Sequence, residues 1–381
     1  MLIQHIGSWM QFTALGYLID QLTKAPIYLG LLGLTQAIPR LLFAFLGGVA
    51  ADRMDRRRVL FVTNGVLMLS AGALGALAYS GRIQVWHILA IGAFNSFTNS
   101  FDMPARQSMV PTLVGERQLM SAVSLNAMAF QGSGIIGPSL GGVLIAAVGV
   151  AGCFFVNMLS YTAVLIALLR MDVPPHAPGE RLSIRDDIRE GIGLLSQHRH
   201  LLGVLGIVAV ISFFGRPYAR LMPALAREVL HVGPTGLGLL QAAPAIGTIL
   251  AVFVIAAIGE TAQKGSLLIT AVIATGAMGM LVGLSTWFAA SLGLLALVGI
   301  SQAVAMATAN TLVQTSVQPN QRGRVMGLYG MVTFGMVALG TMPLGALAGA
   351  IGVGYALAAG GAAVIVLVGL IALALPRITR L

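Results

Sequence analysis

The chain has 381 residues, of which 57% are hydrophobic and 9% are charged, and its formal net charge is +10. Soluble domains normally carry about a quarter of charged residues, so the composition excludes an ordinary water-soluble fold. At about 20 residues for each crossing of the hydrocarbon core, this length allows roughly twelve membrane-spanning helices. The basic residues lie beside apolar runs and not on one polar face, which favours a role in membrane topology over nucleic-acid binding.

The first half of the chain contains six predicted spans. Residues 1–20 are apolar but lack a basic leader and a small-residue cleavage site, so we expect a membrane helix and not a removable signal peptide. Apolar runs bounded by glycine, proline and charged residues predict spans at 2–21, 27–50, 58–79, 84–105, 119–147 and 149–169. Residues 1–170 are therefore predicted to form an N-terminal six-helix half.

A polar stretch separates this half from the next. Residues 171–199 combine Pro174, Pro175 and Pro178 with clustered charges, which is typical of a solvated linker. Six further apolar runs follow, at 200–226, 235–258, 265–285, 288–309, 324–350 and 352–374. The predicted fold is an all-α membrane protein of about twelve transmembrane helices, with residues 200–381 as its C-terminal six-helix half.

Basic residues of the short loops predict the orientation. Most of them fall on one side of the predicted membrane, and the other side has Lys24, Arg82 and Arg227. Cytoplasmic loops collect lysine and arginine, so the richer side is predicted to be cytoplasmic. Both termini and the linker then face the cytoplasm, and we expect the chain to lie in the inner (plasma) membrane.

An internal repeat relates the two predicted halves. The segment GLTQAIP at Gly33–Pro39 matches GLLQAAP at Gly238–Pro244, and Pro138 matches Pro343, both at a displacement of 205 positions. Equivalent helices thus recur six spans later, which favours parallel repeats with a substrate path at their interface. Chance recurrence of glycine and proline in so biased a composition is the alternative.

A charged segment, GGVAADRMDRRR, follows the second span. Its small residues permit close helix packing, and its arginines can pair with carboxylates or simply fix topology. The segment resembles the loop motif G-x-x-x-D-R-x-x-R-R of the major facilitator superfamily, whose positions are occupied by Gly48, Asp52, Arg53, Arg56 and Arg57. The resemblance implies a cytoplasmic latch that favours the outward-open state.

Two further features concern this latch. Asp102, after the fourth span, looks like the acidic partner of the latch in that superfamily, and we expect it to pair with Arg53 or Arg56. The corresponding segment of the second half, Gly259–Lys264, lacks the Asp-Arg core, so the latch is expected to be asymmetric.

The fifth predicted span has little side-chain bulk on one surface. Gly137, Pro138, Gly141 and Gly142 predict a helix that bends and packs closely. This pattern resembles the Gly-Pro motif of exporters in the superfamily, and a bent packing helix without that role is the alternative.

A finer resemblance is to the enterobactin-exporter-like (secretion effector) branch of the superfamily. It rests on Gly7–Gln11 in the first span and on Asp102–Gln107 with Val110–Pro111 after the fourth.

Charged and polar side chains inside the spans are candidates for a substrate cavity, because they are costly in a membrane. Arg216 and Arg220 lie four residues apart on one face of the seventh span, which would suit an anionic substrate; snorkelling of Arg220 and a structural partner for Arg216 are the alternatives. Asp20 is the candidate proton site. The candidate cavity residues, which could equally form hydrogen bonds between helices, are Gln11, Arg40, Asn126, Gln131, Arg216, Arg220 and Gln241.

Motifs of several enzyme classes are absent from the sequence. It has no G-x-x-x-x-G-K-[ST] phosphate loop, no histidine pair at metal-ligand spacing on a predicted span and no nucleophile motif. We therefore expect neither enzymatic activity, nor a cofactor, nor a metal site.

Together these patterns predict a monomeric secondary transporter that exports a drug-like or siderophore-like small molecule by alternating access, with proton antiport as its energy source. The alternatives are a uniporter or nutrient importer of the same fold, and a membrane sensor or assembly partner that does not transport.

Overall fold

The computed structural model describes residues 2–171, 199–259, 263–318 and 321–375, without the side chains of residues 44, 45, 49, 51–53, 110–117 and 119. The predicted linker 171–199 lies outside the described residues except at its two ends. Helices and short connections make up all of the described chain. The chain forms two compact units: the first contains residues 1–180 and 232–242, and the second contains residues 181–231 and 243–381.

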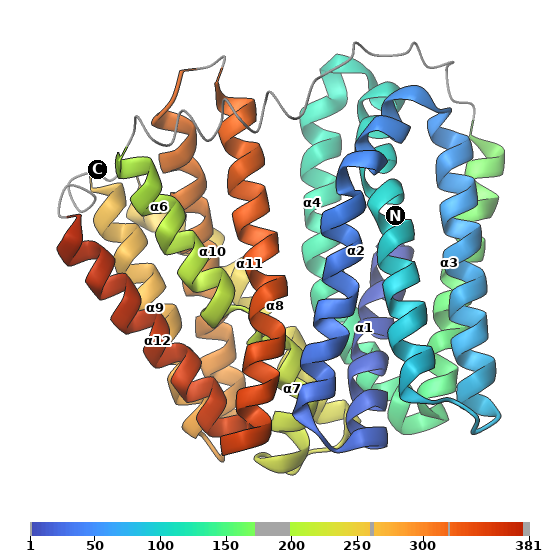
Figure 1. Ribbon diagram of the computed structural model, residues 1–381. Helices are drawn as coiled ribbons and strands as arrows, with labels where there is room; N and C mark the ends of the chain where they lie inside the picture. The colour runs from blue at the N-terminus through green and yellow to red at the C-terminus, as the bar shows by residue number, and fades with distance from the viewer. Residues whose placement is uncertain (1, 172–198, 260–262, 319–320, 376–381) are drawn as a thin grey trace. The chain divides into compact units, whose positions relative to one another are not determined.

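The first unit is built around one long helical segment (Figure 1). Helices α1 (Leu2–Thr23), α2 (Pro26–Arg53) and α3 (Arg56–Tyr79) all pack against α4 (Val85–Arg170). The first three predicted spans therefore correspond to α1, α2 and α3, with ends that differ by a few residues.

Helix α4 contains three predicted spans in one continuous helical assignment of 86 residues. A straight helix of that length would measure about 129 Å, but α4 doubles back on itself (Figure 1). Met109 and Leu168 belong to one buried cluster although 59 positions separate them. At the second reversal Gly149 has a φ of +75°, and the Cys153 Sγ atom lies 3.5 Å from the Gly141 carbonyl oxygen. The spans are thus continuous in the chain but separate in space.

The second unit contains a helix that the sequence did not predict to be broken. The expected span 200–226 consists of α6 (Arg199–Val210), the π-helical segment η1 (Ile211–Gly215) and α7 (Tyr218–Glu228). Arg216 and Pro217 separate η1 from α7. Proline has no N–H group and its ring collides with the preceding turn, so Pro217 interrupts the regular hydrogen bonding at this point.

The remaining spans of the second half are uninterrupted. They are α8 (Pro234–Ile258), α9 (Lys264–Leu284), α10 (Phe288–Thr315), α11 (Arg322–Ile351) and α12 (Val353–Ala374), and α8 begins in the first unit. Helices α9 and α12 approach backbone to backbone, because a Cβ atom at Gly283 would lie 2.3 Å from the Gly354 carbonyl oxygen and one at Gly354 would lie 2.5 Å from that of Gly283. Small residues allow such close contacts between membrane helices.

Nine segments of the described chain are long and apolar enough to cross a membrane, and one of them, residues 120–170, is 51 residues long. That length suffices for two crossings at about 20 residues each. Helix α1 and the start of α4 are not among the nine because they carry polar side chains, several of which are buried: Gln4, Gln11, Asp20 and Asp102. Large apolar side chains such as Leu42, Phe253 and Leu373 are exposed, as expected for a surface that faces lipid.

Candidate functional site

The predicted latch lies at the connection between α2 and α3. Asp55 caps α3 by accepting hydrogen bonds from the backbone N–H groups of Arg57 (2.9 Å) and Arg58 (3.2 Å). The Arg56 Nη1 group donates to the Ser108 carbonyl oxygen in α4 at 2.9 Å. This short connection is therefore tied to the first third of α4.

Arg57 makes a second connection to α4, at its C-terminal end. Its Nε and Nη2 groups donate to the carbonyl oxygens of Leu168 (2.7 Å) and Leu169 (2.9 Å). A guanidinium group satisfies carbonyls that have no partner at a helix C-terminus and interacts favourably with the helix dipole.

Two of the predicted latch residues, Asp52 and Arg53, have backbone positions in α2, but their side chains lie outside the described residues. Gly48 faces open space, since a Cβ atom there would meet nothing within 4 Å. Its neighbour Gly47 packs against α4, where an added Cβ atom would lie 1.8 Å from the Ser100 carbonyl oxygen. The contact is thus made by the glycine next to the predicted one.

Asp102 is the centre of a buried hydrogen-bond network and is 4% exposed. Its Oδ1 atom accepts from Thr63 (2.9 Å) and Asn64 (2.8 Å) of α3. Its Oδ2 atom accepts from the Nη2 (2.7 Å) and Nε (3.1 Å) groups of Arg106. Arg106 also donates to the Gln4 Oε1 atom of α1, and Gln4 donates to the Asn64 Oδ1 atom at 3.0 Å.

The network fixes α1, α3 and α4 to one another through a neutralised charge pair. Charge-assisted hydrogen bonds of this kind are the strong ones, and a carboxylate with four donors is well satisfied inside a protein. The expected pairing of Asp102 with Arg53 or Arg56 stays a prediction. Sequence reasoning missed Arg106, although its spacing of four residues from Asp102 is the spacing at which side chains of a helix meet.

The glycines of the fifth predicted span lie where this span packs closely against other helices of the first unit. A Cβ atom at Gly137 would lie 2.4 Å from the Trp9 Cβ atom, and one at Gly141 would lie 3.2 Å from the Met10 Cα atom. At Gly142 it would lie 2.4 Å from the Pro234 carbonyl oxygen, at the start of α8. Pro138 is buried in the same stretch. These residues therefore pack closely, and their role as a hinge stays a prediction.

Four of the polar cavity candidates belong to the first unit and are buried or partly buried: Gln11, Asn126, Gln131 and Gln241. Gln11 accepts a hydrogen bond from Asn157, and Gln241 accepts one from the Thr13 Oγ1 group at 2.5 Å. These two pairs fit the alternative reading of the amides as hydrogen bonds between helices. Asn126 and Gln131 are partly buried, as is expected for residues beside a cavity or a helix contact.

The charged candidates have different environments. Asp20 is 1% exposed, whereas Arg40 is exposed. Arg220 has an interaction partner of its own. The Nη1 atom of Arg216 is buried and has no hydrogen-bond partner among the described residues. The two arginines of the seventh span therefore differ in their bonding, although the sequence analysis assigned both to the same candidate site.

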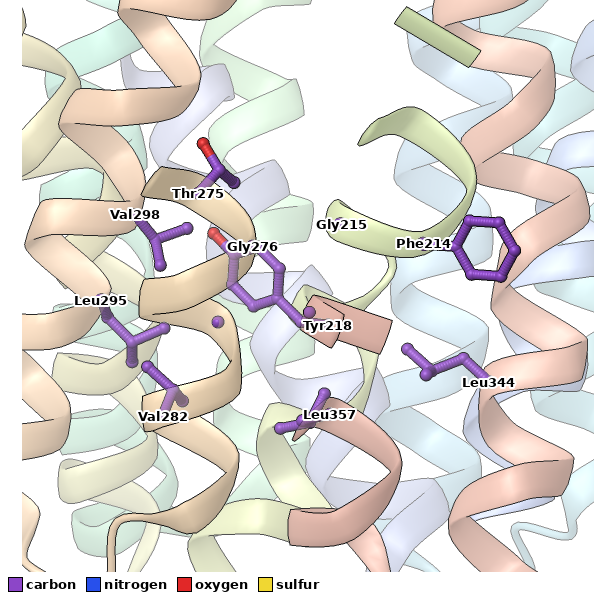
Figure 2. Close-up of a pocket in the computed structure, with 12 residues that line it drawn as sticks. Phe214, Gly215, Tyr218, Thr275, Gly276, Val282, Leu295, Val298, Leu344 and Leu357 are labelled. Carbon is purple, nitrogen blue, oxygen red and sulfur yellow. The ribbon is translucent and has the colours of Figure 1, made fainter. Parts of the chain in front are cut away.

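A pocket lies within the second unit, beside the break in the seventh span (Figure 2). Tyr218 and Thr275 contribute hydroxyl groups. The Thr275 hydroxyl donates to the Ala271 carbonyl oxygen at 2.9 Å and lies within hydrogen-bond distance of the Ser301 hydroxyl, also at 2.9 Å. Apart from these two, the lining is glycine and apolar: Phe214, Gly215, Gly276, Gly279, Val282, Leu295, Val298, Leu344, Leu357 and Gly361. None of the predicted cavity residues lines this pocket.

No group of three or more potential metal-ligating side chains occurs within the described part of the chain.

Comparison with solved structures shows which known proteins share this fold. A bacterial homologue of the human lysosomal transporter Spinster, in an inward-facing and occupied conformation, matches with a TM-score of 0.74 at 14% identity over 99% of this chain and 94% of that one. The nucleoside transporter NupG matches with a TM-score of 0.70 at 14% identity over 97% of each chain. The chain therefore shares the fold of these two proteins, an all-α membrane fold as the sequence predicted.

Comparison with families and curated proteins is more specific. Residues 1–380 match the family model described as transmembrane secretion effector, so the chain belongs to that family of major facilitator transporters. It is therefore a multi-pass membrane transporter and not an enzyme, which confirms the prediction of the family.

Several relatives are exporters by name. The enterobactin exporter EntS of Salmonella typhimurium is 27% identical over 74% of this chain and 68% of its own length. The macrolide efflux protein A of Streptococcus pyogenes is 22% identical over 85% and 81%. The uncharacterized MFS-type transporter YfiS of Bacillus subtilis is 27% identical over 55% of this chain, which spans about half of that relative's length.

Proposed function

We propose that this protein exports a small organic molecule across the bacterial inner membrane by alternating access. The observation that carries the proposal is its similarity to two proteins named as exporters, of enterobactin and of macrolides, each over about three quarters or more of this chain. The two named cargoes are different compounds, so the similarity supports the direction of transport more than any one substrate. We further propose that the protein acts as a monomer, with both termini in the cytoplasm.

The cytoplasmic latch is the part of the proposed mechanism that the first unit supports best. Arg56 and Arg57 tie the α2–α3 connection to two separate parts of α4. The pair of Asp102 and Arg106 joins α4 to α3 through Asp102 and to α1 through Arg106. Such charge-assisted bonds at one end of a helix bundle can hold one conformation and must break or move with the bundle when access changes. The proposed latch comprises Gly48, Asp52, Arg53, Arg56, Arg57 and Asp102, and Gly137, Pro138, Gly141 and Gly142 are the proposed hinge.

Export is tested by comparing the metabolites of cells that lack the protein with those of the same cells complemented by the wild-type gene. We expect at least one compound to accumulate inside the deficient cells and to fall in their medium, because its exit route is lost. Complementation should reverse both changes. The opposite pattern, depletion inside and excess outside, would favour import, and identical profiles would favour a sensor or assembly partner.

Proton coupling is tested in inside-out membrane vesicles with the compound that the comparison identifies. We expect its uptake to stop when the pH gradient is collapsed, because an antiporter takes its energy from that gradient. Asp20→Asn should abolish gradient-driven uptake but keep exchange of labelled for unlabelled compound, since an amide preserves hydrogen bonding but cannot release a proton. Flux that persists without a gradient would indicate a uniporter, and normal driven uptake by Asp20→Asn would exclude Asp20 as the proton site.

A further inference from the structure

The break in the seventh span places an arginine at an interruption of a membrane helix. Arg216 lies between η1 and α7, and the Gly215 carbonyl oxygen before it accepts a hydrogen bond from the Gln302 Nε2 group of α10 at 3.3 Å. Transporters tolerate broken helices where the irregular backbone is buried in protein or borders a cavity, and π-helical segments are frequent at functional sites.

Three buried polar side-chain atoms of the second unit have no hydrogen-bond partner among the described residues: the Ser212 hydroxyl, the Arg216 Nη1 group and the Thr333 hydroxyl. Ser212 precedes Arg216 by four residues, so both can lie along one face of the segment. Thr333 belongs to α11, which packs on this segment closely enough that a Cβ atom at Gly340 would lie 2.1 Å from the Phe213 carbonyl oxygen. Arg216 and Ser212 thus lie on a segment that contacts α11, the helix that carries Thr333.

The charge of Arg216 has no acidic counterpart in the described part of its own unit. From residue 200 onward the sequence has two acidic residues, Glu228 and Glu260. Glu228 pairs with its neighbour Arg227 at 2.8 Å, and Glu260 lies outside the described residues. Tyr218 and Tyr329 are the titratable groups that act electrostatically on Arg216. A partly buried guanidinium with a buried donor and no counter-charge is costly in a membrane protein and is a functional candidate by default.

We propose that Arg216 binds an anionic group of the transported molecule, with the Ser212 and Thr333 hydroxyls as additional donors, so that the substrate class is small organic anions. This inference rests on the proposed transport function. A guanidinium offers paired donors that match a carboxylate or phosphate, and the ligand would supply the missing negative charge. Arg220 is not part of the site, because it already has a partner.

The first test does not require the substrate. In nanodiscs of uncharged lipid, we expect Arg216→Gln to unfold at the same temperature as the wild-type protein or higher, because the variant removes a buried charge that nothing compensates. Arg106→Gln, the matched control, removes a buried arginine that is paired with Asp102 and should unfold at a clearly lower temperature. Equal destabilisation by both variants would show that Arg216 already has a partner and would overturn the proposal.

The second test uses benzoate and its neutral analogue benzamide as probes of the same size. We expect benzoate, and not benzamide, to raise the unfolding temperature of the wild-type protein. Arg216→Gln should weaken benzoate binding by roughly ten- to a hundredfold, the loss of one charged hydrogen-bonding partner, and Arg216→Lys should retain part of it. No preference for benzoate, or a preference that survives in Arg216→Gln, would overturn the proposal.

A lipid headgroup could provide the same anionic chemistry. If phosphatidylglycerol in the nanodisc stabilises the wild-type protein but not Arg216→Gln, and benzoate does neither, the ligand is a lipid and the substrate assignment is wrong. The same experiments distinguish failure of the transport function from failure of the anion site. Unchanged metabolite profiles contradict the transport function, whereas export of a neutral or cationic compound contradicts the anion site alone.

Discussion

Gly47→Ala is expected to prevent stable folding of the first unit, whereas Gly48→Ala is expected to fold as well as the wild-type protein. A Cβ atom at Gly47 would lie 1.8 Å from the carbonyl oxygen and 2.6 Å from the carbonyl carbon of Ser100, both rigid backbone atoms of α4. Overpacking a well-filled interior typically costs about 1–3 kcal/mol even when flexible side chains can adjust, and here they cannot. A Cβ atom at Gly48 would meet nothing within 4 Å.

The two variants form a matched pair because both add one methyl group to adjacent positions of α2. Alanine favours a helix over glycine by about 1 kcal/mol at either site, so this gain cancels in the comparison. Size-exclusion chromatography and the unfolding temperature of the purified protein measure the result. A stable Gly47→Ala protein would contradict the close approach of α2 and α4, and loss of transport by a stable Gly48→Ala protein would support the latch.

Asp102→Ala is expected to be strongly destabilising, by about 3–5 kcal/mol, because it leaves Arg106 as a buried charge without its partner. Thr63 and Asn64 would lose their shared acceptor in the same variant. The double variant Asp102→Asn with Arg106→Gln should recover part of the loss, since it removes both charges and keeps groups that can form hydrogen bonds.

A double-mutant cycle on the unfolding free energy measures this coupling. Residues that share an ion pair typically show interaction energies of about 0.5–3 kcal/mol. Effects of Asp102→Asn and Arg106→Gln that simply add would show that the pair does not stabilise the first unit.

The pattern of apolar runs was sufficient to predict the positions of most helices, because a membrane requires a similar length and an apolar composition of every span. It placed α1, α2, α3, α8, α9, α11 and α12 within a few residues of their observed ends, and it placed the start of α10 but not its end at Thr315. It did not detect the break at Arg216 and Pro217, because the surrounding run is apolar enough to be predicted as one helix. A proline after Gly215 was the available local signal.

Side-chain partners were harder to predict because they depend on which faces of different helices meet. Asp102 was singled out from the sequence as the acid of the latch. Its hydrogen bonds with Thr63 and Asn64, and the bond from Arg106 to Gln4, join residues from three helices. The motif directed attention to Gly48, whereas the close contact with α4 belongs to Gly47. Motif spacing identifies a segment, and the rotation of its helix decides which residue makes the contact.

The bonds from Arg57 to the carbonyl oxygens of Leu168 and Leu169 have a mechanical consequence. They fasten the C-terminal end of α4 to the start of α3, two positions after Asp55. A pull on the chain beyond residue 170 is therefore transmitted first to the α2–α3 connection and not to the end of α4 alone. The C-terminal end of α4 is thus attached directly to the part of the protein proposed to act as the latch.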